Sequence, residues 1–94
     1  MKSIIQSEKE CYLTGARYNL HEHHVFYGSG LRSKSEKYGL KIFLRADLHN
    51  LSAKGVHFNR ALDLKLKREI QEIAMNCYGW TKEDFIRIFG KNYI

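Results

Sequence analysis

LHEHHVFYGSGLRSKSEKYGLKIFL, residues 20–44, sets out the architecture of this chain. Residues 20–27 contain β-branched and aromatic side chains and stop at Gly28, which predicts a β-strand. Residues 28–39 are polar and basic, so we expect a long loop there. The apolar run LKIFL at 40–44 predicts a second strand, and the two strands together indicate a hairpin with a long basic loop.

The pattern after Asn59 is helical. Apolar residues recur at intervals of three and four, and charged residues occupy the other positions. The apolar positions are Leu62, Leu66, Ile70, Ile73, Ala74 and Cys77. We expect Asn59 to cap this helix and Gly79 to end it.

A second, shorter helix is predicted at about residues 81–89. Thr81 is a suitable N-cap, Asp84 would favour the helix dipole, and Trp80 could pack on Phe85 as a hydrophobic staple. The order strand, loop, strand, turn, helix, helix predicts an α+β fold in one domain of residues 1–94. We expect a core of about residues 20–77 and a packed C-terminal helix.

Composition indicates a globular basic protein. Sixteen Lys and Arg against ten Asp and Glu give a formal charge of +6, which favours a polyanionic partner, nucleic acid first. An ordinary solvated basic protein is the alternative. The two cysteines, Cys11 and Cys77, make a disulfide framework or a sulfur-ligated zinc site improbable. We find no signal peptide or membrane span and expect a cytoplasmic protein.

Four of the five histidines lie in the central part of the chain: His23, His24, His49 and His57. Histidine is the commonest metal ligand and the commonest general base near neutral pH. On a regular strand, His23 and His24 would point to opposite faces. His49 and His57 would be offset by roughly 80° on one helix, but a loop over 50–55 could bring both rings together. His21 has no assigned role, and we expect it at the surface.

This window resembles the HNH (ββα-metal) nuclease family. HEHHVFYGSGL followed by KIFLRADLHNLSAKGVH has the family order of a histidine strand, a long loop, a second strand and a late histidine pair. The separation of His24 and His49, 25 positions, is close to that of the colicin-type HNH nucleases. Residues 11–59 are also similar to small phage-encoded HNH proteins, including the recombination-enhancement nucleases.

The resemblance implies divalent-metal-dependent cleavage of single- or double-stranded DNA, with a place in recombination or phage DNA metabolism. His24 would be the general base, and His23, His49 and His57 would hold one Zn, Ni, Mn or Mg ion. Glu22 would orient a histidine without binding the metal itself. The expected phosphate contacts are Arg32, Lys34, Lys37, Lys41 and Arg45, for which the alternative is an ordinary solvated surface.

The chain departs from the family pattern in three places. The family Asn that braces the base-histidine loop should fall near Tyr38 and Gly39, so a backbone group or Tyr38 would have to replace it. The final histidines are eight residues apart instead of the common four, and Cys11 stands without the usual second cysteine. Two other functions stay open: a DNA-binding module built on the last two helices, and an interaction protein stabilised by a structural metal.

Overall fold

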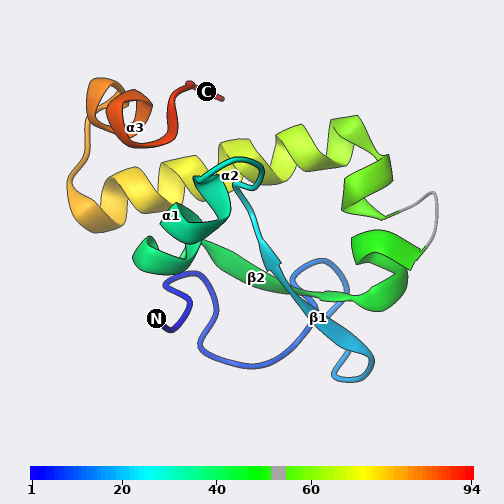
Figure 1. Ribbon diagram of the computed structural model, residues 1–94. Helices are drawn as coiled ribbons and strands as arrows, with labels where there is room; N and C mark the ends of the chain where they lie inside the picture. The colour runs from blue at the N-terminus through cyan, green and yellow to red at the C-terminus, as the bar shows by residue number, and fades with distance from the viewer. Residues whose placement is uncertain (52–54) are drawn as a thin grey trace.

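A two-stranded antiparallel sheet and several helices form an α+β fold, which confirms the predicted class (Figure 1). The computed structural model describes residues 1–51 and 55–94. Its elements are β1 Leu20–His24, α1 Leu31–Tyr38, β2 Lys41–Arg45, the π-helical turn η1 Asp47–Leu51, the 3₁₀ turn η2 Val56–Phe58, α2 Arg60–Tyr78 and α3 Lys82–Phe89. In the view of Figure 1, α2 runs between the sheet and α3.

The register of the sheet determines which side chains meet. His23 pairs with Ile42 and His24 pairs with Lys41, so the two adjacent histidines lie on opposite faces of a regular strand. β1 ends at His24, earlier than predicted. Val25 and Phe26 follow it as fully buried core residues.

The predicted loop at 28–39 was wrong, because most of this segment is the helix α1. Its side chains at Leu31 and Tyr38 pack against the core, but the residue between them on the same face is Ser35, which is fully buried. A polar residue in the central position hides the helical period of so short a segment. The helix ends at Gly39, whose φ is +71° and where an added Cβ would lie 2.5 Å from the Lys2 carbonyl oxygen.

The two predicted C-terminal helices are confirmed, together with their caps. The Asn59 side chain accepts a hydrogen bond from the Leu62 N–H, and Gly79 ends α2 with a left-handed φ. Thr81 and Asp84 form a reciprocal capping box at the start of α3.

The core joins both sheet and helices. Leu66, Ile70 and Ala74 of α2 are fully buried, whereas Cys77, predicted on the same stripe, is exposed. Phe26 packs against Phe85 and Phe89 of α3. Trp80, which we expected to pack on Phe85, has ring contacts with Tyr38 and Tyr78. Among the described helices, none combines the length and apolar character needed to cross a membrane.

Candidate metal centre

Three histidines from three separate elements converge at one place. His23 comes from β1, His49 from η1 and His57 from η2, and one ring nitrogen of each lies within 4.8 Å of the others. The Nε2 atoms of His49 and His57 are 3.1 Å apart. Two nitrogen ligands of a tetrahedral metal are separated by roughly 3.3 Å, given bonds of about 2.0–2.1 Å. The two nitrogens lie within hydrogen-bond distance of each other, and their spacing is also close to that of two ligands of one cation.

Of the loop predicted at 50–55, Asn50 and Leu51 belong to the π-helical turn η1, and residues 52–54 lie outside the described part of the chain. Gly55 allows the chain to pass close to η1, because an added Cβ there would lie 2.9 Å from the His49 carbonyl. His49 and His57 are therefore brought together although no single helix carries them both.

His23 is buried without a hydrogen-bond partner for one of its nitrogens. It is 1% exposed, and its Nε2 atom has no partner among the described residues. An unpaired buried polar atom costs about 1–3 kcal/mol, which a ligand would recover. Burial, together with His49 and His57, lowers the pKa of His23 to about 3. Burial also lowers the pKa of His49 to about 4, so both rings are neutral donors near pH 7.

His21 does not lie free at the surface, contrary to our expectation. It is half-buried on the same face of β1 as His23, and its Nδ1 atom lies 3.0 Å from Nδ1 of His49. One of these two nitrogens must carry a hydrogen. His49 can therefore direct Nε2 toward the cluster while its Nδ1 atom is held by His21.

His24 lies on the other face of β1 but borders the same hollow. A pocket of about 220 Å³ is lined by His23, His24, His49 and His57, together with Glu22, Tyr27 and Arg32. The His24 side chain is 11% exposed, and its Nε2 atom lies 2.9 Å from Oε1 of Glu36. The chain thus places a carboxylate-bound imidazole beside the three-histidine cluster.

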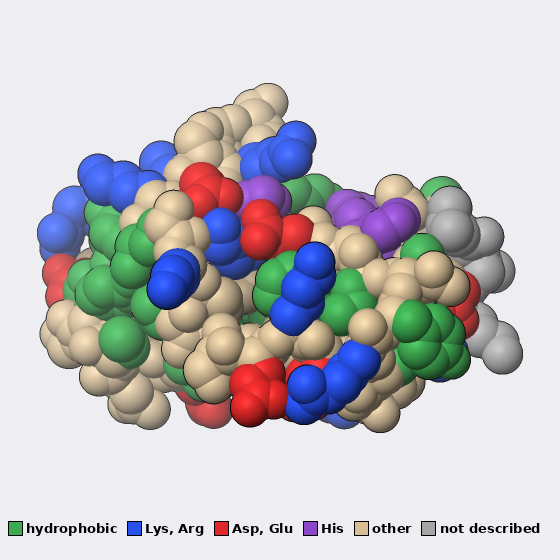
Figure 2. Space-filling view, turned by 90° about the horizontal axis from the view of Figure 1, so that it is seen from below, with side chains coloured by type: hydrophobic (Ala, Val, Ile, Leu, Met, Phe, Trp, Pro, Cys, Tyr) green, Lys and Arg blue, Asp and Glu red, His purple; other side chains and the backbone are tan. Residues whose placement is uncertain are grey.

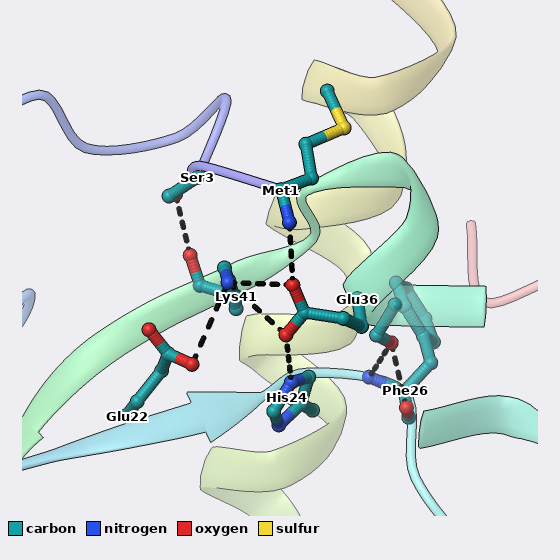
Figure 3. A network of polar contacts seen from close by, with 8 residues as sticks. Met1, Ser3, Glu22, His24, Phe26, Glu36 and Lys41 are labelled. Carbon is teal, nitrogen blue, oxygen red and sulfur yellow. Dashed lines mark hydrogen bonds and ion pairs between the residues drawn. The ribbon is translucent and has the colours of Figure 1, made fainter. Parts of the chain in front are cut away.

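The carboxylate that contacts this histidine is Glu36 of α1, not Glu22. Glu22 instead lies 3.5 Å from the Nζ atom of Lys41 (Figure 3). Its predicted role in orienting a histidine is therefore not supported by a contact. Sequence reasoning missed Glu36 because it lies in the segment predicted as a loop. Glu22, His24 and Glu36 also form a second group of potential ligands, but the Lys41 ammonium already lies among them.

The five predicted phosphate contacts fall into two groups. Arg32 lines the pocket, and Lys34 and Lys37 are exposed on α1, with Lys34 donating to the Ile88 carbonyl. Lys41 is buried and paired with Glu36, and Arg45 is paired with Asp47 at 2.6 Å. Lys41 and Arg45 are thus both engaged in ion pairs with carboxylates of the chain itself. Figure 2 shows acidic and basic side chains side by side near the histidines.

The backbone that follows His24 is held by a backbone group, the Leu40 carbonyl, which accepts a hydrogen bond from the Val25 N–H at 3.0 Å, and by the side chain of Ser35. Its hydroxyl donates to the Phe26 carbonyl at 2.6 Å and accepts from the Phe26 N–H at 3.1 Å. The Tyr38 carbonyl instead accepts a hydrogen bond from the Tyr78 hydroxyl. The chain just after His24 is therefore fixed to α1 through a buried serine.

Comparisons with protein-family models, with curated proteins and with solved structures found no match to this chain. Assignment of a function therefore rests on the residues and on the geometry of the centre.

Proposed function

We propose that this protein is a divalent-metal-dependent endonuclease that hydrolyses phosphodiester bonds of DNA. The observation that carries the proposal is the convergence of His23, His49 and His57 in a pocket that His24 also lines. Metal ligands and a separate base are the two components that such hydrolysis requires.

The three-histidine cluster fits a divalent metal on the evidence of its own atoms. The rings of His23 and His49 are held neutral, His23 has an unpaired buried nitrogen, and two Nε2 atoms are 3.1 Å apart. Imidazole donors suit Zn, Ni or Mn better than Mg. A bound metal would stabilise negative charge on the phosphate and on the leaving oxygen.

The number of ligands favours a catalytic centre over a structural one. A structural zinc site is closed by four protein ligands, whereas a catalytic site keeps a position for water or substrate. The described residues provide three histidines to the cluster, and the fourth nearby ring, His21, is engaged with the far nitrogen of His49. Three ligands leave coordination positions open.

His24 would take the proton of the attacking water, as a separate base beside the ligands. Its position on the opposite strand face keeps it out of the three-histidine cluster, although it borders the same pocket. Arg32, which lines the pocket, would hold the phosphate, because a guanidinium can donate two parallel hydrogen bonds to it. Lys34 and Lys37 would add long-range attraction for DNA.

The order of the elements supports the HNH (ββα-metal) resemblance. β1 carries the adjacent histidines, β2 pairs with it antiparallel, and the late histidines precede α2. The helix α1 lies within the hairpin connection, and π and 3₁₀ turns carry His49 and His57. A role in recombination or phage DNA metabolism belongs to the same proposal.

A plasmid-nicking assay tests the proposal directly. The purified protein is incubated with supercoiled and single-stranded DNA and with Mn²⁺, Zn²⁺, Ni²⁺ or Mg²⁺ in turn, and His24→Ala serves as the control. We expect metal-dependent nicking by the wild type alone. Intact DNA with all four metals on both substrates would reject the endonuclease function.

A further inference from the structure

Glu36 of α1 contacts the ring of His24, the proposed general base. Glu36 receives three groups from three parts of the chain: the Met1 amino group at 2.8 Å, the Lys41 ammonium at 2.9 Å and the His24 ring at 2.9 Å (Figure 3). His24 and Lys41 meet there because they are direct partners in the sheet. The contact between Glu36 and His24 is therefore produced by the β-register and by the position of α1.

The ionised carboxylate determines which nitrogen of His24 carries the hydrogen. A carboxylate only accepts hydrogen bonds, so the Nε2 atom of His24, at 2.9 Å from Oε1, must be the donor. A neutral imidazole has one N–H, and its other nitrogen then has a free lone pair. Nδ1 of His24 is thereby left as the atom that can take a proton.

The Met1 amino group, the His24 ring and Lys41 together keep the Glu36 carboxylate ionised. The Lys41 ammonium lies 3.1 Å from Oε1 and 2.9 Å from Oε2, and Lys41 is 8% exposed. The pKa of Glu36 lies well below its usual range because its carboxylate accepts hydrogen bonds from the Met1 amino group, His24 and Lys41. Glu36 is thus an acceptor throughout the neutral pH range.

Ser35, which precedes Glu36 on α1, holds this part of the helix in place. Ser35 makes two hydrogen bonds to the backbone of Phe26, two residues after His24, and is fully buried. Successive residues of α1 therefore fix the backbone that follows His24 and the ring of His24 itself. This double attachment limits movement of the ring relative to the helix.

We infer that Glu36 is the positioning residue of His24, holding the ring in the tautomer whose Nδ1 atom is free to accept a proton from water. The inference rests on the proposed function, since it gives the reason why His24 can serve as the base. The same partnership of a carboxylate and a histidine orients the base in many hydrolytic sites.

The test combines a direct view of the ring with kinetics. Long-range ¹H–¹⁵N NMR spectra of the histidine-labelled full chain at pH 7.5 report which nitrogen of His24 carries the hydrogen, with His24→Gln used to assign the signal. Cleavage kinetics are then measured for Glu36→Gln, Glu36→Asp and Glu69→Gln with saturating Mn²⁺. Glu69 is the matched control, because it is a helical carboxylate of similar exposure, 40% against 42%, that binds Tyr12 away from the pocket.

We expect the hydrogen of His24 on Nε2 in the wild type and a mixture of tautomers in Glu36→Gln. The kcat of Glu36→Gln should fall by about 10- to 100-fold, as for loss of other orienting partners, with KM and Mn²⁺ affinity unchanged. Glu36→Asp should recover part of the loss, and Glu69→Gln should cleave like the wild type. If the ion pair only stabilised the fold, Glu36→Gln would lower the melting temperature and leave kcat and the tautomer unchanged.

Two results would overturn the inference: a hydrogen on Nδ1 of wild-type His24, or a wild-type kcat in Glu36→Gln. A wild type that binds no metal and cleaves no DNA would reject the proposed function and with it the catalytic meaning of Glu36. In that case the NMR spectrum would still show whether the contact between Glu36 and His24 exists, so the two failures are distinguishable.

Discussion

The two faces of β1 carry histidines in opposite electrostatic surroundings. On one face, His23 lies buried among the rings of His49, His57 and Tyr27. On the other face, His24 lies beside the Glu36 carboxylate and pairs across the sheet with Lys41. The comparison shows how strand alternation divides two adjacent histidines: one face offers neutral donors to a cation, and the other offers an imidazole oriented by a charge.

Removal of His24 gives the largest expected effect on the charged face. His24→Ala should lower kcat by ~10²–10⁴, the usual cost of losing a general base, while the protein still binds metal and DNA. Single-turnover cleavage of a labelled duplex at saturating Mn²⁺ measures this loss. Wild-type cleavage by His24→Ala would show that the charged face has no part in the reaction.

Removal of His21 should lower the metal affinity of the three-histidine cluster while leaving the three proposed ligands in place. His21→Leu leaves Nδ1 of His49 without its partner at 3.0 Å, so metal affinity should fall by about 10- to 100-fold. His21→Gln, which can still accept a hydrogen bond, should lose less. Competition titration with a coloured Zn²⁺ chelator measures both affinities. Unchanged affinity in His21→Leu would mean that the contact between the two rings does not orient His49.

The buried state of His23 makes the metal-free protein less stable in mild acid. The pKa of His23 is about 3 in the folded chain and near 6.5 when unfolded, so the unfolded chain binds more protons between these values. The free energy of unfolding should therefore be highest above pH 6.5 and fall as pH decreases, by about 2 kcal/mol from this group at pH 5.

Urea denaturation in EDTA at pH 7.5 and pH 5.0 measures this loss of stability. His23→Leu should show a smaller difference between the two pH values than the wild type, because the remaining groups titrate in both proteins. Equal differences in the two proteins would contradict the burial of an uncharged His23.

The smallest expected effect concerns Arg32, which lines the pocket. Arg32→Ala should weaken DNA binding several-fold and reduce the slope of log affinity against log salt by about one, the value for one lost phosphate contact. Arg87→Ala is the control, since Arg87 is exposed on α3 and pairs with Asp84 there. Fluorescence anisotropy with a labelled duplex between about 50 and 300 mM salt, roughly a sixfold range, measures both slopes. Equal slopes for the two variants would place the DNA elsewhere.

Local rules were sufficient where the determining contacts are local. Asn59, Gly79 and the Thr81–Asp84 pair act within one turn of their own helices, so the caps of α2 and α3 were predictable from the sequence. α1 was not, because its central inward-facing residue is Ser35, whose burial is compensated by hydrogen bonds to Phe26. Hydrophobic periodicity has no means of detecting such a position.

The histidines of the candidate site were predictable from the sequence, but the residues that contact and orient them were not. Adjacency and spacing identified His23, His24, His49 and His57, and the structure places all four around one pocket. The contacts of Glu36 with His24 and of His21 with His49 join residues 12 and 28 positions apart. They depend on the sheet register and on where α1 packs, which no local pattern contains.

Calorimetric titration of Zn²⁺ into the wild type, His23→Ala and His24→Ala tests the division between the two faces of β1 most directly. The wild type should bind one equivalent, and His24→Ala should bind with nearly the same affinity. His23→Ala should lose more affinity than the roughly 10- to 100-fold expected for an outer partner, because it removes a ligand itself. Circular dichroism of each variant verifies folding. Loss of Zn²⁺ binding in His24→Ala with retention in His23→Ala would reverse the roles assigned to the two histidines and contradict the account.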